Sequence, residues 1–296
     1  MKIGLQIIRF NWEGVVPQQI GAKVAEIART ADGVGFDSLW VMDHFFQMEM
    51  PARNFDAEQP MMDGYTVLAY LAGHTQRATL GTMVTGVHYR QPGHLIKIVT
   101  NLDVLSGGRA MLGIGAGWYE RESHGLGFPF PPLAERFERL EETLQLAHQM
   151  WADDPAPFHG KHYHLAEPIN HPQPLTKPHP PILIGGSGEK KTLRLVAQYA
   201  NACNIFAYGG AAAVQQKLDV LKAHCDALGR DYDTIERTTL DTARIGMGAT
   251  PAELIDRCRQ LAAVGVQHAI FNMPMDYTIT PLETIGREVI PALREL

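Results

Sequence analysis

Eight short apolar segments alternate with eight longer helical patterns along this chain, and no other feature of the sequence restricts the fold as much. Most of the short segments are apolar on both faces, which is typical of parallel strands that helices cover. Eight such units predict an α/β protein with a (β/α)8 TIM barrel, whose usual size is about 250 residues. A doubly wound open sheet remains the alternative, because periodicity alone does not separate the two folds. The expected strands are Ile3–Ile8, Ser38–Met42, Thr79–Val84, Ala110–Gly115, Pro181–Ile184, Ala202–Phe206, Thr238–Thr242 and Gln267–Asn272.

The helical patterns carry two kinds of local signal. Over Leu133–Trp151, apolar residues recur at helical spacing on one face, and glutamates and arginines lie off that face. Near the C-terminus, Thr250-Pro251-Ala252-Glu253 and Thr280-Pro281-Leu282-Glu283 each predict a capping box at a helix start. The expected helices are Pro17–Gly33, Gly64–Gln76, Gly93–Leu105, Leu133–Trp151, Glu189–Tyr199, Ala211–Leu228, Pro251–Val264 and Pro281–Leu293.

The chain is longer than a minimal barrel, and one segment accounts for most of the excess. Residues 152–180 are rich in proline and histidine and show no helical stripe. We expect one domain over residues 1–296, with this segment as an irregular insertion over the barrel mouth and one hairpin through Lys161–Leu165. A second long connection, Phe45–Asp63, follows the second expected strand.

Composition excludes several classes of function. The 26 Lys and Arg against 32 Asp and Glu give a formal net charge of −6, and the longest basic run is the pair Lys190-Lys191, so no nucleic-acid partner is expected. Three widely spaced cysteines and the irregular spacing of the histidines at 159–171 predict neither a disulfide framework nor a metal site. The apolar run at Met1–Leu5 is too short for a signal peptide, and no window approaches the ~18 apolar residues of a membrane span. A cytoplasmic enzyme is expected.

In a (β/α)8 barrel, functional groups gather at the carboxyl ends of the strands. Asp43 and His44 follow the second expected strand, where they can act as an acid–base pair or serve the structure alone. The methionines at 48, 50, 61 and 62 either pack or line an apolar pocket, and the sequence leaves this open. The remaining strand exits lead to Arg9, Asn11 and Trp12; to Val84, Thr85 and His88; to Gly117-Trp118-Tyr119; to Gly185–Gly188; and to Met273-Pro274-Met275.

Two glycine-rich strand exits predict different ligand contacts. Gly185-Gly186-Ser187-Gly188 follows an apolar strand and precedes a helix, so its backbone N–H groups favour a phosphate, with a plain βα turn as the alternative. Gly113–Gly117 fails the fuller dinucleotide fingerprint, because Trp118 occupies the place of its last glycine. We therefore expect these glycines to let a flat ligand approach the backbone.

Taken together and in order, five motifs make the chain similar to the luciferase-like monooxygenase superfamily, in the branch of oxidoreductases that use the deazaflavin coenzyme F420. The resemblance covers nearly the whole chain. It is carried by Val41–Phe45, Leu80–Pro92, Leu102–Arg109, Gly115–Glu122 and Ile182–Gly188.

The resemblance implies a barrel that holds a flavin or deazaflavin at its carboxyl face, with the phosphate on Gly185, Gly186, Ser187 and Gly188. It places a non-prolyl cis peptide at Met83–Val84, behind the ring and next to Thr82. It puts Asp43 and His44 beside the reactive edge of the ring and makes Gly115, Ala116 and Gly117 a backbone wall.

The activity that the resemblance implies is hydride transfer between coenzyme F420 and a small, largely apolar substrate, with His44 exchanging the matching proton and Asp43 orienting it. The sugar-phosphate dehydrogenases of the superfamily carry an acidic residue where this chain has Trp118, which puts a sugar-phosphate substrate in doubt. Trp12, Phe45 and Trp118 are expected to form the substrate pocket. A homodimer is also implied.

Three other functions stay open at this point. The same barrel can use reduced FMN and oxygen as a monooxygenase, or it can bind a flavin or deazaflavin without turnover. A cofactor-free lyase ranks last, because no expected strand contains a lysine or ends in paired acids. The identity of the substrate and the direction of hydride transfer are not readable from the sequence.

Overall fold

The structure, a computed structural model, describes residues 1–50, 55–273 and 279–295 and contains a closed barrel of eight parallel strands. The sheet runs in the order β3-β2-β1-β11-β10-β9-β8-β5, and a further pairing of β3 with β5 closes the ring. The predicted barrel is confirmed, and the open-sheet alternative is wrong. The strands are β1 (Lys2–Ile7), β2 (Ser38–Val41), β3 (Thr79–Thr82), β5 (Ala110–Gly115), β8 (Ile182–Gly185), β9 (Ala202–Phe206), β10 (Glu236–Thr242) and β11 (His268–Asn272).

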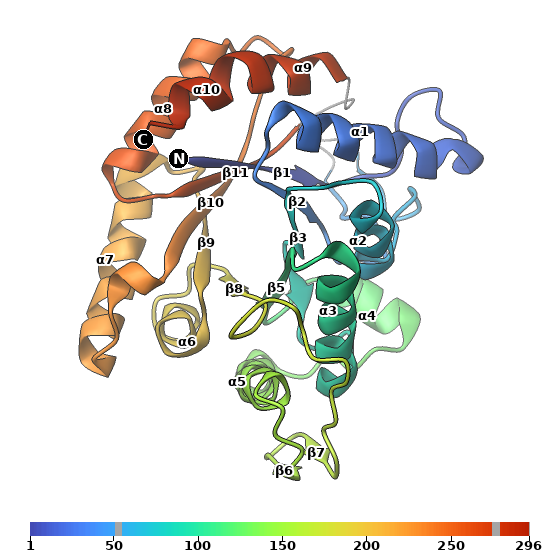
Figure 1. Cartoon of the computed structure of the whole chain (residues 1–296), viewed down its shortest axis with the longest axis vertical. Coiled ribbons are helices and arrows are strands. Elements are labelled where there is room, and N and C mark those ends of the chain that lie inside the picture. Colours follow the sequence, from blue (N-terminus) through green and yellow to red (C-terminus); the bar gives the residue numbers. More distant parts are fainter. Residues whose placement is uncertain (51–54, 274–278, 296) are drawn as a thin grey trace.

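Helices surround the strands, and the two ends of the chain lie close together (Figure 1). All eight expected helical regions are present, but the short helix α4, just after the β5 exit, was not expected. The helices are α1 (Ile20–Val34, preceded by the 3-10 turn η1, Pro17–Gln19), α2 (Gly64–Ala72), α3 (Pro92–Ser106), α4 (Glu120–Leu126), α5 (Leu133–Trp151), α6 (Thr192–Tyr199), α7 (Gly210–Leu228), η3 (Tyr232–Thr234), α8 (Pro251–Ala263), α9 (Ile279–Thr284), the π-helical η4 (Ile285–Val289) and α10 (Ile290–Leu293).

One of the two predicted capping boxes forms. Thr250 Oγ1 accepts from the Glu253 backbone N–H at 3.3 Å, and Glu253 Oε2 accepts from the Thr250 N–H at 2.7 Å. The second box is wrong, because α9 already includes Ile279 and Thr280 therefore lies inside the helix. The predicted exit Met273-Pro274-Met275 falls partly outside the described residues, which resume at Ile279.

Large side chains fill the barrel interior. Trp40 is buried there, and its indole N–H donates to Ser38 Oγ at 2.7 Å, which lies 2.8 Å from His268 Nε2. Apolar side chains from the other strands pack around Trp40, whereas a second and larger core lies between the strands and the helices. The interior is thus solid below its carboxyl end, which leaves room for a ligand only at the mouth. The interior cluster consists of Trp40, Met83, Met111, Leu183, Ala202, Leu240 and Ile270.

The predicted hairpin in the insertion is present as β6 (Phe158–His159) and β7 (His164–Leu165). It lies beside the first half of α5, where His162 pairs with Glu138 at 2.7 Å. Figure 1 shows β6 and β7 below α5, away from the strands. Buried Glu142 on α5 accepts from the backbone N–H groups of Lys161 and Tyr163 at 2.7 and 2.9 Å, which ties the hairpin to the outside of the helix layer.

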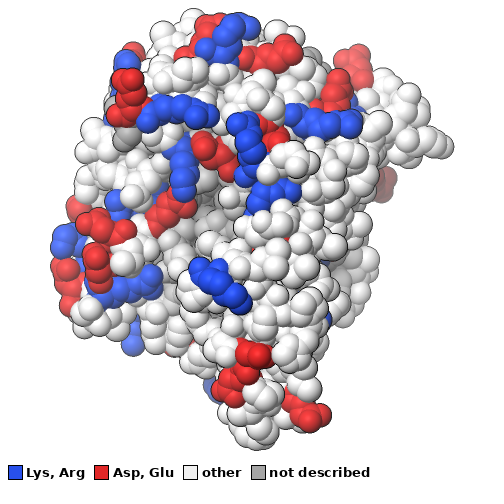
Figure 2. Space-filling view, in the orientation of Figure 1, with Lys and Arg blue, Asp and Glu red and all other residues white. Residues whose placement is uncertain are grey.

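Figure 2 shows one face of the molecule, on which Lys and Arg are interspersed with Asp and Glu and form no large patch of one sign. Within residues 1–50, 55–273 and 279–295, no helix combines the length and the apolar content that crossing a membrane requires.

Candidate active site

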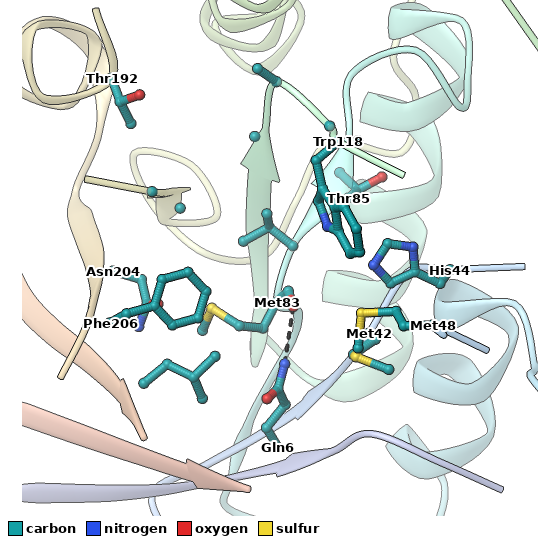
Figure 3. A pocket seen from close by; sticks show the side chains of 18 of the residues that line it. Gln6, Met42, His44, Met48, Met83, Thr85, Trp118, Thr192, Asn204 and Phe206 are labelled. Atoms are coloured by element: carbon teal, nitrogen blue, oxygen red, sulfur yellow. Dashed lines mark hydrogen bonds between the residues drawn. The ribbon is translucent and has the colours of Figure 1, made fainter. Parts of the chain in front are cut away.

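A cavity of about 560 Å³ opens at the carboxyl ends of the barrel strands. Its walls come from residues that follow β2, β3, β5, β8 and β9, so it lies where a barrel places its functional groups. Figure 3 shows His44 and Trp118 on one side of this cavity and Asn204 and Phe206 on the other, with Met83 between them.

One wall of the cavity is flat, because Gly115 and Gly185 pack closely against Val84. The Met83–Val84 peptide is cis, as the sequence resemblance implied. A Cβ on Gly185 would lie 2.8 Å from Val84 Cγ1, and a Cβ on Gly115 would lie 3.0 Å from Val84 Cγ2. Side chains at these positions would collide with Val84, so glycine is needed for the close approach. Together with Ala116 and Gly117, which also line the cavity, this wall can receive a planar ring.

The floor of the cavity is polar but uncharged. Gln6 Nε2 donates to the Met83 carbonyl at 3.1 Å, and Asn272 Oδ1 accepts from Thr242 Oγ1 at 2.9 Å. Asn204 also lines the floor and donates to Thr238 Oγ1 at 2.9 Å. Sequence reasoning missed these amides, although each is a polar residue within a buried and mostly apolar strand, which was a usable signal.

His44 is held by a carboxylate from a distant part of the chain. His44 Nδ1 lies 2.6 Å from Glu122 Oε1, and Glu122 is fully buried on α4. The second oxygen, Glu122 Oε2, accepts from the backbone N–H groups of Phe45 and Phe46 at 2.6 and 3.1 Å, and the Tyr89 hydroxyl donates to Oε1. Because Glu122 accepts from Nδ1, that nitrogen carries a proton, and Nε2 remains for exchange with a molecule in the cavity.

The environment keeps Glu122 charged. Burial alone would raise its pKa, but the hydrogen bond and the charge of His44, the Tyr89 hydroxyl and the Phe45 N–H outweigh burial and lower the pKa. Burial and the neighbouring Glu122 charge raise the pKa of Tyr89, so its hydroxyl stays protonated and can donate. The arrangement is a histidine with a fixed tautomer beside an anion, which suits general acid–base chemistry.

Asp43 does not orient His44, so the expected Asp43–His44 pair is wrong. Asp43 is fully buried and does not line the cavity; Arg90 Nη2 donates to its Oδ1 at 3.0 Å, and the same guanidinium pairs with Asp63. Asp63 in turn caps α2 by accepting from the Thr66 N–H at 2.8 Å. Neighbouring residues of an extended chain point to opposite sides, so His44 reaches the cavity and Asp43 reaches the helix layer.

Three more of the expected contacts lie elsewhere. Thr82 is buried, and its hydroxyl donates to the Gly113 carbonyl at 2.8 Å. Trp12 packs edge-on against Phe10, with ring centroids 6.1 Å apart. Phe45 packs against the rings of Tyr89 and Phe128 at 5.2 and 5.1 Å. None of the three lines the cavity. Of the expected substrate-pocket residues, Trp118 alone does.

The expected phosphate loop is divided between two adjoining cavities. Gly185, Gly186 and Thr192 line the main cavity, whereas Ser187 and Gly188 line a neighbour of about 500 Å³ that shares Thr192 and Phe137 with it. The neighbour is also lined by three lysines and by Glu189, which pairs with Lys217 at 2.6 Å, and α6 begins beside it at Thr192 rather than at the expected Glu189. Glycine N–H groups, a helix N-terminus and cations can together hold an anion. The lysines are Lys190, Lys191 and Lys217.

The described residues include no cluster of side chains suited to bind a metal ion. In the part of the chain that the structure describes, no three His, Cys, Asp or Glu side chains gather closely enough to hold a metal ion. His162 of the hairpin instead pairs with Glu138 at 2.7 Å, on the outside of α5.

Fold and site together define a (β/α)8 barrel with an enzyme-type pocket at its carboxyl end. The model of the luciferase-like monooxygenase family matches residues 1–278, so the chain belongs to that family. The family expected from the sequence is thereby confirmed.

Two curated relatives carry the same name. An F420-dependent glucose-6-phosphate dehydrogenase from Kineococcus radiotolerans is 28% identical over 260 residues, which cover 86% of this chain and 72% of the relative. Another from Nakamurella multipartita is 29% identical over 341 residues and covers 98% of this chain and 97% of the relative. Among solved structures, an F420-dependent secondary alcohol dehydrogenase in complex with an F420–acetone adduct matches with a TM-score of 0.82, 16% identity and coverage of 99% of both chains, a likeness that supports the fold.

Proposed function

We propose that this oxidoreductase transfers a hydride between coenzyme F420 and a small, largely apolar organic substrate. The observation that carries the proposal is the His44–Glu122 pair at the edge of a cavity that has a glycine-lined wall and adjoins a second cavity lined by lysines. The names of the curated relatives support the cofactor.

The residues present fit a flat ring with an anionic tail. Gly115 and Gly185 add no side chain to the surface beside Val84, which leaves room for a ring there. Gly186 and Thr192 lie between that wall and the lysine-lined cavity. In that cavity, backbone N–H groups and lysines would bind the phosphate and the carboxylates of the cofactor tail. Coenzyme F420, when bound, supplies a ring carbon that carries the hydride.

The protein's part in the reaction is to hold and move one proton and to exclude water. His44 Nε2 gives a proton to the substrate atom that becomes negative during reduction, or takes it in the reverse direction. Glu122 stabilises the protonated imidazole, and Tyr89 fixes Glu122. Met42, Met48 and Met50 line the same cavity as His44 and keep it apolar. Low polarity around the reacting atoms strengthens the charge interactions among them.

A cofactor titration tests the proposal. The purified protein is titrated with coenzyme F420 and, separately, with FMN, and binding is followed by the fluorescence of each cofactor. We expect micromolar or tighter binding of F420 and binding of FMN at least tenfold weaker. The Lys190→Gln/Lys191→Gln double variant should weaken F420 binding, while Lys222→Gln, a lysine on α7 that pairs with Asp226, should leave it unchanged.

The alternative is an FMN-dependent monooxygenase, which the name of the family favours. Preferential FMN binding in the same titration, followed by oxygen consumption with reduced FMN, would replace the proposal with this alternative. Binding of either cofactor without turnover of any substrate would favour a storage protein. The homodimer and the cytoplasmic location remain predictions, and the dimer can be checked by sedimentation.

A further inference from the structure

The cavity mouth exposes an unusual amount of aromatic surface. Trp118 is 61% exposed and stacks on Tyr119, with ring centroids 5.1 Å apart. Phe206 and Tyr208 are 51% and 61% exposed and stack on each other at 5.4 Å with an angle of 17° between the rings. Trp118, Phe206 and Tyr208 all line the cavity. Exposed aromatic surface on two sides of one cavity is typical of a ligand-binding site.

The two aromatic groups flank a glycine-rich strand exit. Trp118 follows β5 and Phe206 ends β9, and β8 lies between these strands in the ring. The exit of β8 carries Gly185 and Gly186, so this strand places no side chain of its own between the two aromatic groups. Figure 3 shows Trp118 beside His44 on one side of the cavity and Phe206 on the other. A planar molecule held between these exposed rings would lie at the mouth, outside the ring that the proposed function places against Val84 and Gly115, with one edge near His44.

The charge of the lining restricts the occupant further. Among the described residues that line this cavity there is no Lys, Arg, Asp or Glu. The lysines at 190, 191 and 217 line the neighbouring cavity, on the side that the proposed function gives to the cofactor tail. A phosphate dianion in the main cavity would lose its hydration without gaining a cation, which is a large cost.

We infer that the substrate is an uncharged, planar, aromatic or conjugated carbonyl compound, or the matching alcohol, held between Trp118 and the Phe206–Tyr208 pair. This inference rests on the proposed function and narrows its substrate. It also separates this chain from its curated relatives, whose names specify glucose 6-phosphate. Phe206 and Tyr208 thereby become specificity residues, since neither approaches His44 in the contacts that the structure describes.

The test compares a flat and a puckered ketone of the same skeleton. The F420-loaded protein is titrated by calorimetry with 2-acetonaphthone, with its decahydro counterpart and with glucose 6-phosphate. The decahydro ketone is no less apolar, so a preference for the naphthyl ketone reports stacking rather than hydrophobicity. We expect the naphthyl ketone to bind about tenfold more tightly, and glucose 6-phosphate not to bind at millimolar concentration.

Variants of Phe206 and Tyr208 test whether this aromatic pair causes the preference for the naphthyl ketone. Phe206→Leu and Tyr208→Leu keep apolar volume but remove a ring, and each should weaken naphthyl ketone binding by about five- to tenfold while leaving the decahydro ketone unchanged. Tyr70→Leu, on an exposed tyrosine of α2 that does not line the cavity, is the control. Retained circular dichroism and F420 affinity show that the variants are folded.

Equal binding of the two ketones, an unchanged preference in both leucine variants, or micromolar binding of glucose 6-phosphate would each overturn the inference. The ketone titrations are repeated without cofactor, so that the preference is measured whether or not F420 binds. Failure of the proposed function shows separately, as absence of F420 binding in a titration that contains no ketone.

Discussion

At the scale of single residues, Glu122 determines what His44 can do. Adjacency in the sequence pointed to Asp43 as the partner of His44, but the contact is made by a carboxylate 78 residues away. No local pattern reveals a pairing over that distance, because it depends on α4 folding back over the β2 exit. Glu122 ends the family motif Gly115–Glu122, but the motif alone does not show that its carboxylate contacts His44.

Replacing Glu122 tests the pair directly. Glu122→Gln keeps the shape of the side chain but removes its charge, so the protonated form of His44 loses its stabilising anion. We expect the downfield proton resonance of the His44 Nδ1–H to disappear and turnover of the naphthyl ketone to fall by about 10²- to 10³-fold. Glu138→Gln, which alters a glutamate–histidine pair outside the cavity, should do neither. An unchanged His44 resonance and normal turnover in Glu122→Gln would show that the pair has no part in the reaction.

At the scale of helices and strands, the sequence was most informative where periodicity is regular. The buried strands and long helices such as α5 follow from the spacing of apolar residues. α4 was missed because it has only seven residues and too little apolar periodicity to stand out. The composition of the insertion predicts a loop with a hairpin, but it does not show that this hairpin packs on the outside of α5, where Glu142 accepts from its backbone N–H groups.

The base of the barrel provides a pH-dependent prediction at this scale. Glu236 at the start of β10 pairs with Lys2 of β1 at 2.9 Å and lies 3.6 Å from His268 of β11. Burial would raise the pKa of Glu236, but His268 and Lys2 outweigh burial and lower the pKa from 4.5 to about 2. The ionised form is therefore favoured by folding, and its contribution, up to roughly 3 kcal/mol, is present above pH 4.5 and is lost as the pH falls toward 2.

Urea unfolding of Glu236→Gln measures this contribution. The variant should be less stable than the parent at pH 7, and the difference in the free energy of unfolding should shrink between pH 5 and pH 3. Glu26→Gln, which removes an exposed partner of Lys23, should show little difference at any pH. A Glu236→Gln deficit that is constant or grows on acidification would contradict the assigned pKa.

At the scale of the whole molecule, the number and order of elements were sufficient to predict the barrel, and the barrel was sufficient to predict which end carries the site. The sequence did not show which side chains at the strand exits turn inward. Trp12 and Phe45 were expected in the substrate pocket but pack against other aromatic rings. Phe206 and Tyr208 line the cavity, although the sequence did not predict them as pocket residues. Whether a side chain at a strand exit points into the cavity depends on the last residues of the strand and on the neighbouring loops. Their arrangement is set only when the strands close into the barrel.

We propose above all that this cavity binds a tricyclic redox cofactor with its reactive edge toward His44. The most direct measurement is a crystal structure of the protein with bound coenzyme F420. We predict electron density for the ring against Val84 and Gly115, its central ring within reach of His44, and a tail that passes Gly186 and Thr192 toward Lys190 and Lys191. Density for the ring outside this cavity, or a tail that points away from the lysines, would contradict the claim.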